Sequence, residues 1–322
     1  MITLSPLANF GSAVPWGLWV SIYIWLVGIS AGNFSMIMWG QLKDKPHIKK
    51  LTRIGMVLSL SCLLAGLLSI LADLGHIERS YKLFISPNFT SIMAWMVWMY
   101  NVYAAVLLGS LLFLKKDFPK IFSKIGFLFG ITLLLLEGLL FAMPPGKLWH
   151  SPIFVIHFLT SSLASGILAL IVVVSFFWEK DGKEEFIKQL GNSAVVFILG
   201  NLLIEIIEMI AHGNVTHTAN WLLIGGGIIV IALLLKRASS TITLAAIIGL
   251  INILLSKYYS VVSAQIVEPF KNFSHTYIEP RIQFSYAPSA FEFLVAIFLV
   301  CAAGVLFYFL YRIFPLTREE KI

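Results

Sequence analysis

Residues 15–34 read PWGLWVSIYIWLVGISAGNF, and this stretch decides the class of protein. It contains no charged residue and matches the ~20 residues that an α-helix needs to cross ~30 Å of hydrocarbon. Trp16 and Trp19 open the stretch, and tryptophan gathers at membrane interfaces. Gly28 and Gly32 are spaced as a small-xxx-small face, which predicts close packing against another helix. The stretch therefore predicts a transmembrane helix.

The composition extends that conclusion to the whole chain. The 322 residues are 59% apolar and only 12% charged, with a mean hydropathy of +0.90. A soluble domain of this size does not bury so much apolar surface, so the bilayer is the expected solvent. The net charge of +7 does not indicate a nucleic-acid partner, because the lysines lie in short loops between apolar segments. Cys62 and Cys301 both lie in apolar runs and indicate neither a disulfide framework nor a metal site.

The pattern of apolar runs predicts a single integral membrane domain of nine helices. Helices are expected because lipid offers no hydrogen-bond partners to the backbone. The first Lys or Arg is Lys43, so the first run lacks the basic start of a secretory signal and is expected to be retained. The expected spans are about 16–39, 54–75, 91–114, 125–143, 152–178, 192–212, 219–235, 240–262 and 289–311.

The basic residues predict the orientation. Seventeen of the 23 Lys and Arg residues fall on the side that follows the first span. The positive-inside rule then places the N-terminus outside and the C-terminus in the cytoplasm. Lys257 is assigned by this count to the outer side. The outer segments, above all 260–288, are rich in aromatic residues and proline, which fits either a surface for a partner protein or ordinary loops in the interfacial aromatic belt.

Ionisable residues inside the expected spans are the main functional signal. Each costs roughly 2.5–3.5 kcal/mol at the centre of a membrane helix, so several together indicate a function. With the orientation above, all fall in the outer halves of their helices, where groups that take and give protons are expected to gather. Structural hydrogen bonds between helices are the alternative for the glutamates. The residues are Asp73, Glu137, His157, Glu205, Glu208 and Glu292, with His76 one turn after Asp73.

Individual residues in this set have simpler explanations as well. Glu292 is expected to cap the last helix, because it follows Ser289 by three residues. Asp73 has an interfacial ion pair with His76 or Arg79 as its alternative. Glu205 and Glu208 lie one turn apart, and two carboxylates so close are not both ionised cheaply in a poor dielectric.

The histidines do not predict an electron path across the membrane. His76, His157 and His212 all lie at outer helix ends, and no span has a histidine in its inner half. Two haems stacked across the membrane are therefore excluded. A membrane anchor that binds one haem between two of the outer histidines remains an alternative function.

Several motifs, taken in order along the chain, resemble one known family. PWGLWVSIYIWLVGISAGNF is similar to the first-helix signature of the NrfD/PsrC family, the quinone-interacting membrane subunits of polysulfide reductase and related enzymes. LADLGHIERSYKLF with PNFTSIMAWMVWMY resembles the second and third helices of that family. EGLLFAMPPGKLWHSPIFVIHFLTSSLASGIL resembles its fourth and fifth helices, and YAPSAFEFLVAIFLVCAAGVLFYFLY resembles its last helix.

The resemblance implies a fold of two four-helix bundles plus one extra helix. It implies that the chain binds menaquinone or another quinone near the outer face and holds no haem. An iron–sulfur subunit in the periplasm would connect the quinone to a molybdopterin catalytic subunit, and the location would be the bacterial inner membrane. The chain departs from many relatives by having His76 after Asp-Leu-Gly, with Arg79 three residues later as the source of a fixed positive charge.

The sequence thus supports a specific hypothesis. A quinone from the lipid sits against Tyr23, Asp73, His76, Glu137 and His157, with Arg79 beside it, and Glu205 and Glu208 form a proton path or a second half-site. A proton-coupled transporter is the alternative from another class; its broken helices have one candidate in Gly225–Gly227.

Overall fold

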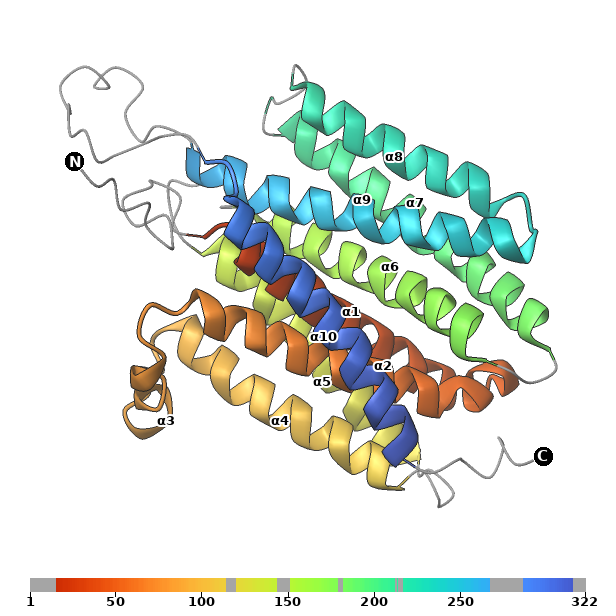
Figure 1. Ribbon diagram of the computed structural model, residues 1–322, viewed down its shortest axis with the longest axis horizontal. Helices are drawn as coiled ribbons and strands as arrows, with labels where there is room; N and C mark the ends of the chain where they lie inside the picture. Colours follow the sequence, from red (N-terminus) through yellow and green to blue (C-terminus); the bar gives the residue numbers. More distant parts are fainter. Residues whose placement is uncertain are drawn as a thin grey trace.

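The computed structural model describes residues 16–113, 120–143, 151–178, 182–211, 213, 217–266 and 286–314. This part of the chain forms nine long helices that run antiparallel in sequence order, with two short helical segments between α2 and α4 (Figure 1). The elements are α1 (Leu18–Leu42), α2 (Pro46–Asp73), η1 (Ile77–Arg79), α3 (Lys82–Ile85), α4 (Ile92–Leu112), α5 (Lys120–Ala142), α6 (Pro152–Phe177), α7 (Lys183–Ala211), α8 (Thr218–Leu234), α9 (Ser239–Ile266) and α10 (Ala290–Ile313).

Each of the nine expected spans corresponds to one long helix, which confirms an all-α membrane protein. Eight helices are long and apolar enough to cross a bilayer, and α8, with 17 residues, is shorter. The expected start of two spans was wrong, because α2 begins at Pro46 and α7 at Lys183. Both helices start with polar turns, and hydropathy marks only the apolar part of a helix, whereas the backbone hydrogen bonds continue beyond it.

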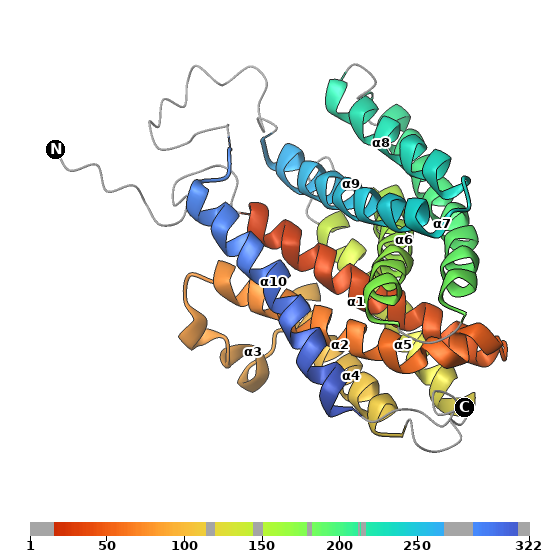
Figure 2. The same cartoon turned by 45° about the vertical axis from the view of Figure 1, so that its right-hand side comes forward.

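The helices pack as two groups of four with α10 added. α1, α2, α4 and α5 pack around one another, and α6, α7, α8 and α9 form the second group. α1 also contacts α6 and α9, so it joins the two groups, and α10 lies against α2 and α1 (Figure 2). This packing agrees with the arrangement that the resemblance implied. α1 is accordingly the most central helix, and nearly all of its residues are buried.

Small residues hold α1 against α6, as the spacing of Gly28 and Gly32 predicts. A Cβ atom added to Gly32 would collide with the backbone carbonyl of Ser162, and one added to Gly166 would collide with the backbone of Asn33. At Gly28 the Cβ would meet the Ser162 side chain at 2.7 Å. The two helix backbones therefore approach more closely than side chains would allow.

Two sets of polar contacts connect the helices at the end of the bundle where α1 turns into α2. Asp44 pairs with Lys49 (3.0 Å) and with Lys120 of α5 (2.8 Å), and these lysines lower the pKa of the exposed Asp44 carboxyl. The buried Arg53 guanidinium donates hydrogen bonds to the backbone carbonyls of Tyr311 and Phe314. Arg53 thus holds the last turn of α10 against α2.

One sequence-based interpretation is wrong. Gly225–Gly227 do not break a helix, because α8 continues from Thr218 to Leu234. Lys257, counted among the basic residues of the outer side, lies within α9, as the expected span 240–262 implies, and is only 5% exposed. His212 and most of 260–288 lie outside the described residues. The side of the membrane that each helix end faces stays a prediction.

Candidate functional site

The ionisable residues expected inside the spans lie near one end of the helix bundle. Hydrogen bonds from Trp16 N to Gln265 Oε1 (3.1 Å) and from Leu18 N to the Tyr286 hydroxyl (2.9 Å) tie α1 at this end to α9 and to the residues before α10. Five candidate residues lie within two turns of it: Tyr23 of α1, Glu137 of α5, His157 of α6, and Glu205 and Glu208 of α7.

The first polar group, which we call the tyrosine–glutamate centre, consists of Tyr23, Tyr100 and Glu137. The Tyr100 hydroxyl, from α4, donates a hydrogen bond to Glu137 Oε1 and also shares one with the Tyr23 hydroxyl. All three side chains are buried, and Glu137 has no exposed surface. Glu137 Oε2 is also buried and has no hydrogen-bond partner among the described residues. A buried carboxylate oxygen without a partner is rare and indicates either a bound proton or a ligand.

Tyr100 was not among the sequence-based candidates. It lies nine residues into the expected span 91–114, deeper than the interface where tyrosine is common. This depth within a span is the sequence feature that could have made Tyr100 a candidate, and Tyr23 has the same feature.

The second polar group, which we call the histidine–glutamate centre, joins α6 to α7. His157 Nδ1 lies 2.6 Å from Glu208 Oε2, and His157 Nε2 lies 3.4 Å from Glu205 Oε1. Glu205 Oε1 also accepts hydrogen bonds from Ser256 of α9 (2.8 Å) and from Asn201 (3.1 Å). The imidazole therefore lies between the Glu205 and Glu208 carboxylates. The sequence alone suggests that these two carboxylates repel each other, because they lie one helical turn apart.

Lys257 lies between the two centres and is a second residue that sequence reasoning missed. Its Nζ donates to Ser162 Oγ (3.3 Å) and lies 3.6 Å from the centroid of the Phe158 ring. It is also within Coulombic range of Glu137. On the other side, a cavity of about 10 Å³ is lined by both Lys257 and His157.

The remaining candidates lie at the rim of the same end. Asp73 ends α2, is partly exposed and is within Coulombic range of Glu292. His76 is exposed and lies 2.7 Å from Glu78 Oε1, and the exposed Arg79 lies 3.9 Å from the same oxygen. In the described part of the chain these residues make no hydrogen bond or ion pair with either buried centre. The five-residue quinone site of the sequence hypothesis therefore divides into separate groups.

Glu292 has the capping role that the sequence favours. The Ser289 side chain accepts a hydrogen bond from Glu292 N (3.2 Å), and Glu292 Oε2 accepts one from Ser289 N (2.6 Å), which together form a capping box. Tyr286, whose pKa is raised mainly by burial, donates a hydrogen bond to Glu292 Oε1 (3.3 Å).

An apolar groove of about 410 Å³ runs along the outside of the bundle at this end. It lies between α1, α9 and α10, and its lining is apolar. Leu18 and Ile22 of α1 contribute to it, and they lie five residues and one residue before Tyr23. The groove suits a lipid chain or the tail of a lipid-soluble molecule.

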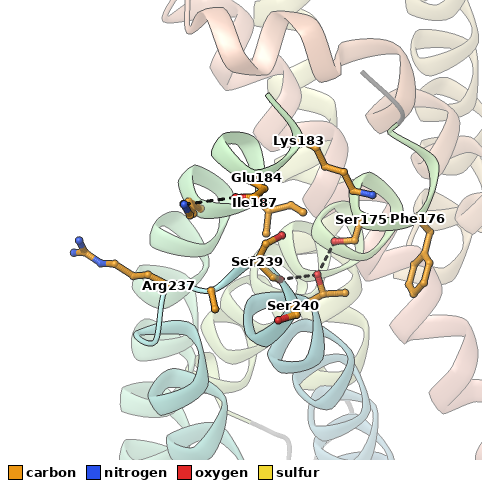
Figure 3. A pocket seen from close by; sticks show the side chains of 11 residues that line it. Ser175, Phe176, Lys183, Glu184, Ile187, Arg237, Ser239 and Ser240 are labelled. Carbon is orange, nitrogen blue, oxygen red and sulfur yellow. Dashed lines mark hydrogen bonds and ion pairs between the residues drawn. The ribbon is translucent and has the colours of Figure 1, made fainter. Parts of the chain in front are cut away.

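A polar cavity of about 670 Å³ lies at the opposite end of the bundle (Figure 3). Lys183 and Glu184 of α7, Ser175 of α6 and Ser239 at the start of α9 contribute to its lining, and Arg237 points away from the other side chains. Because it is a bundle length away from both polar centres, it is not part of the candidate site.

Comparison with known proteins places this architecture in a family. The family described as "Polysulphide reductase, NrfD" matches residues 7–269. The chain belongs to the NrfD family. The resemblance given by the helix motifs is thereby confirmed, and this NrfD protein is a multi-pass integral membrane protein.

Individual relatives of this NrfD protein are distant, and two of them match nearly its whole length. A selenate reductase subunit of Mesobacillus selenatarsenatis is 24% identical, over 99% of this chain and 89% of the relative. The Hdr-like menaquinol oxidoreductase integral membrane subunit of Archaeoglobus fulgidus is 22% identical, over 98% of this chain and 88% of the relative. A protein of Halobacterium salinarum, named as a dimethyl sulfoxide reductase membrane subunit, is 26% identical over 50% of this chain and 42% of the relative.

Proposed function

We propose that this protein is the quinone-interacting membrane subunit of a multi-subunit, polysulfide reductase-like oxidoreductase. It exchanges electrons between menaquinol, or another quinone, and a redox partner, with coupled proton transfer. Membership of the NrfD family and the similarity to membrane subunits of named reductases support a role in such a complex. The similarity to a menaquinol oxidoreductase subunit supports the quinone.

The observation that carries the proposal is the tyrosine–glutamate centre. Reduction of a quinone takes up two electrons and two protons, so a site for this chemistry needs a hydrogen-bond donor for the carbonyl oxygen and a group that carries protons. The Tyr23 and Tyr100 hydroxyls supply donors, and Glu137 supplies the carboxyl group. The partnerless Glu137 Oε2 is an orphaned buried polar atom that a ligand or a proton would satisfy.

The surroundings of the centre fit a lipid-soluble substrate. The apolar groove between α1, α9 and α10 includes residues of the same α1 segment as Tyr23, and its lining residues Leu255, Phe293 and Ile297 are exposed on the outside of the bundle. An isoprenoid tail has the length and polarity that such a groove accepts, while the ring would need the polar centre. Position and proton chemistry come from the protein, and the electron chemistry comes from the quinone and the partner.

The partner in this proposal is an iron–sulfur subunit in the periplasm, connected to a molybdopterin catalytic subunit, at the inner membrane of a bacterium. A surface for it is offered by η1 and α3, which protrude beside the helix bundle (Figure 1). Ile77, Tyr81 and Ile85 expose large apolar side chains there, and Ile85 is 76% exposed. Apolar side chains exposed beyond a membrane bundle are typical of a docking surface.

The test is electron transfer in the intact complex, purified with its partner subunits. The complex is reduced with dithionite, menadione is added, and reoxidation of the partner's clusters is followed by visible absorbance. The wild-type complex should be reoxidised, and Glu137→Gln should slow this by roughly 100-fold, the size of a general acid–base contribution. Glu184→Gln, at the opposite end, is the matched control and should behave as wild type. Failure of the wild type to reduce menadione would remove the proposal.

The two other functions have weaker support. A transporter of the broken-helix type loses its candidate break, because α8 is continuous through Gly225–Gly227. A haem held by His157 would require the imidazole to leave Glu205 or Glu208, since both ring nitrogens face carboxylates. The visible spectrum of the purified subunit, without partners, tests the haem directly.

A further inference from the structure

Lys257 occupies a position in which a cation is expensive. It lies in α9 nine residues before the helix ends, and 5% of it is exposed. A lysine within a membrane helix is costly, so such residues face a protein interior and mark a function by default. No salt bridge within 4 Å joins Lys257 to a carboxylate of the described residues, although Phe158 and Ser162 solvate its ammonium group. Packing alone does not explain the charge.

The surroundings of Lys257 come from every helix at the junction of the two groups. α5 presents Glu137, within Coulombic range of the ammonium group. α6 presents Ser162 and His157, and α1 presents Gly28, where an added Cβ would lie 3.7 Å from Lys257 Nζ. Gly28 of α1 therefore lies beside the ammonium group, and the close contact that an added Cβ would make there is with Ser162 Oγ (2.7 Å). α7 presents Glu205 and Glu208 behind His157.

The cavity between Lys257 and His157 fits one water molecule. Its volume of about 10 Å³ is near the minimum for one water. Ser161 and Ser260 line it together with the two basic side chains, so a water there has the two to four polar partners that it needs. A water in this cavity would connect His157 to Lys257, and Glu137 lies beyond Lys257, within Coulombic range of its ammonium group.

We propose that Lys257 passes protons between the histidine–glutamate centre and the tyrosine–glutamate centre. In quinone reduction the flexible Lys257 side chain turns from Ser162 toward Glu137, an N–H bond of its ammonium breaks, and the proton forms an O–H bond with the Glu137 carboxylate. The amine lone pair then takes a proton from the cavity water, which regains one from His157 Nε2, the ring nitrogen with the longer carboxylate contact (3.4 Å). Glu208, 2.6 Å from Nδ1, returns a proton to the imidazole from the aqueous side. Electrons come from the partner subunit. The inference rests on the proposed function, which assigns quinone chemistry to Glu137.

The substitution that separates a relay from a fixed counter-charge is Lys257→Arg. Arginine keeps the positive charge but does not release its proton in proteins, so it replaces a counter-charge and not a relay. We expect Lys257→Arg and Lys257→Met each to slow menadione reduction by the dithionite-reduced complex roughly 100-fold, with menadione affinity unchanged. Lys257→His, which can release a proton, should recover most of the rate at acidic pH and little at alkaline pH. It should also show a larger solvent deuterium isotope effect than the wild type.

Lys236→Arg and Lys236→His, at the exposed end of α8, are matched controls and should leave the rate unchanged. Assembly of each complex is checked by size-exclusion chromatography. If the larger guanidinium of Lys257→Arg prevents assembly, the relay is tested by the pH dependence of the menadione reduction rate in Lys257→His. Wild-type rates in Lys257→Arg, or a Lys257→His profile parallel to that of the wild type, would overturn the relay. Absence of menadione reduction by the wild type itself would instead count against the proposed function.

Discussion

The Tyr100 hydroxyl donates a hydrogen bond to Glu137 Oε1 inside the first group of four helices, where Glu137 is fully buried and Tyr100 is only 8% exposed. This bond joins α4 to α5, and the hydroxyl contact with Tyr23 extends it to α1. Glu137 Oε1 accepts the hydrogen bond from Tyr100, while Glu137 Oε2 has no partner among the described residues and is available to bind a proton or a ligand. The Tyr100–Glu137 contact therefore joins two helices and also positions a carboxyl group for proton transfer.

Tyr100→Phe separates these two roles. The change removes the donor to Glu137 but keeps the aromatic ring, which packs edge-on against Tyr23 with centroids 6.2 Å apart. We expect menadione reduction to fall by tenfold or more while the complex still assembles, since a lost hydrogen bond to a charged group costs about 1.5–3 kcal/mol. Tyr23→Phe removes the hydroxyl that contacts Tyr100 but keeps the Tyr100–Glu137 hydrogen bond, so it should slow menadione reduction less. A Tyr23→Phe variant slower than Tyr100→Phe would show that the Tyr23 hydroxyl matters more to the reaction than the donor to Glu137.

His157 should matter for stability as well as for turnover. Removal of one partner from a buried ion pair costs about 3–5 kcal/mol, and His157→Leu leaves Glu205 and Glu208 without their shared partner. We expect a clear fall in the thermal unfolding midpoint of the purified subunit. The triple variant His157→Leu, Glu205→Gln, Glu208→Gln should recover much of the stability, because it removes the buried charges, but not the turnover. Equal stability of the single and triple variants would indicate that the three residues do not act as a unit.

Asp73 and Glu292 lie at the same rim but should give opposite phenotypes. Asp73 makes no hydrogen bond or ion pair within the described residues, whereas Glu292 completes the capping box of α10. Asp73→Asn should therefore leave assembly and the unfolding midpoint unchanged while it lowers quinone-linked turnover. Glu292→Ala should lower stability by about 1 kcal/mol, as loss of a cap does, with turnover retained. Full turnover in Asp73→Asn would exclude Asp73 from the reaction.

Arg53 gives a prediction that is independent of quinone chemistry. Its guanidinium donates to the carbonyl groups of Tyr311 and Phe314, where the last turn of α10 lacks partners of its own, and it also stacks 4.0 Å from the Tyr311 ring centroid. Arg53→Lys loses the planar group that makes these contacts, so we expect faster proteolysis near residue 314 in purified protein. Lys50→Arg, three residues before it and exposed, is the control. Protection equal to the wild type would show that α10 does not depend on this contact.

The sequence predicts the helices well because length and hydropathy are local properties, whereas the site depends on which helix faces meet. The end of the bundle that holds the polar residues follows from alternating helix direction, and so does the gathering of Glu137 and His157. The partners of these residues do not follow from it. Tyr100 is one aromatic residue among many in its span, and Lys257, inside the expected span 240–262, was considered only as one of the basic residues that set the orientation. Only the packing of α9 against α1 and α6 shows why a lysine is accommodated there.

Gly32 should be the least replaceable residue of the opening stretch. A methyl group there would collide with the Ser162 carbonyl of α6, and backbone atoms of two packed helices do not move aside as the tip of a side chain does. Gly32→Ala should therefore separate α1 from α6 and reduce the amount of folded protein extracted from membranes, with a fall of at least severalfold in a fluorescence size-exclusion assay. Gly304→Ala, in α10, is the matched control, because no atom lies within 4 Å of its added Cβ. The same contact also predicts coupling to the site, since Ser162 accepts the hydrogen bond from Lys257. Any Gly32→Ala protein that does fold should be slower in menadione reduction than the Gly304→Ala protein, and equal rates would show that the close α1–α6 approach serves packing alone.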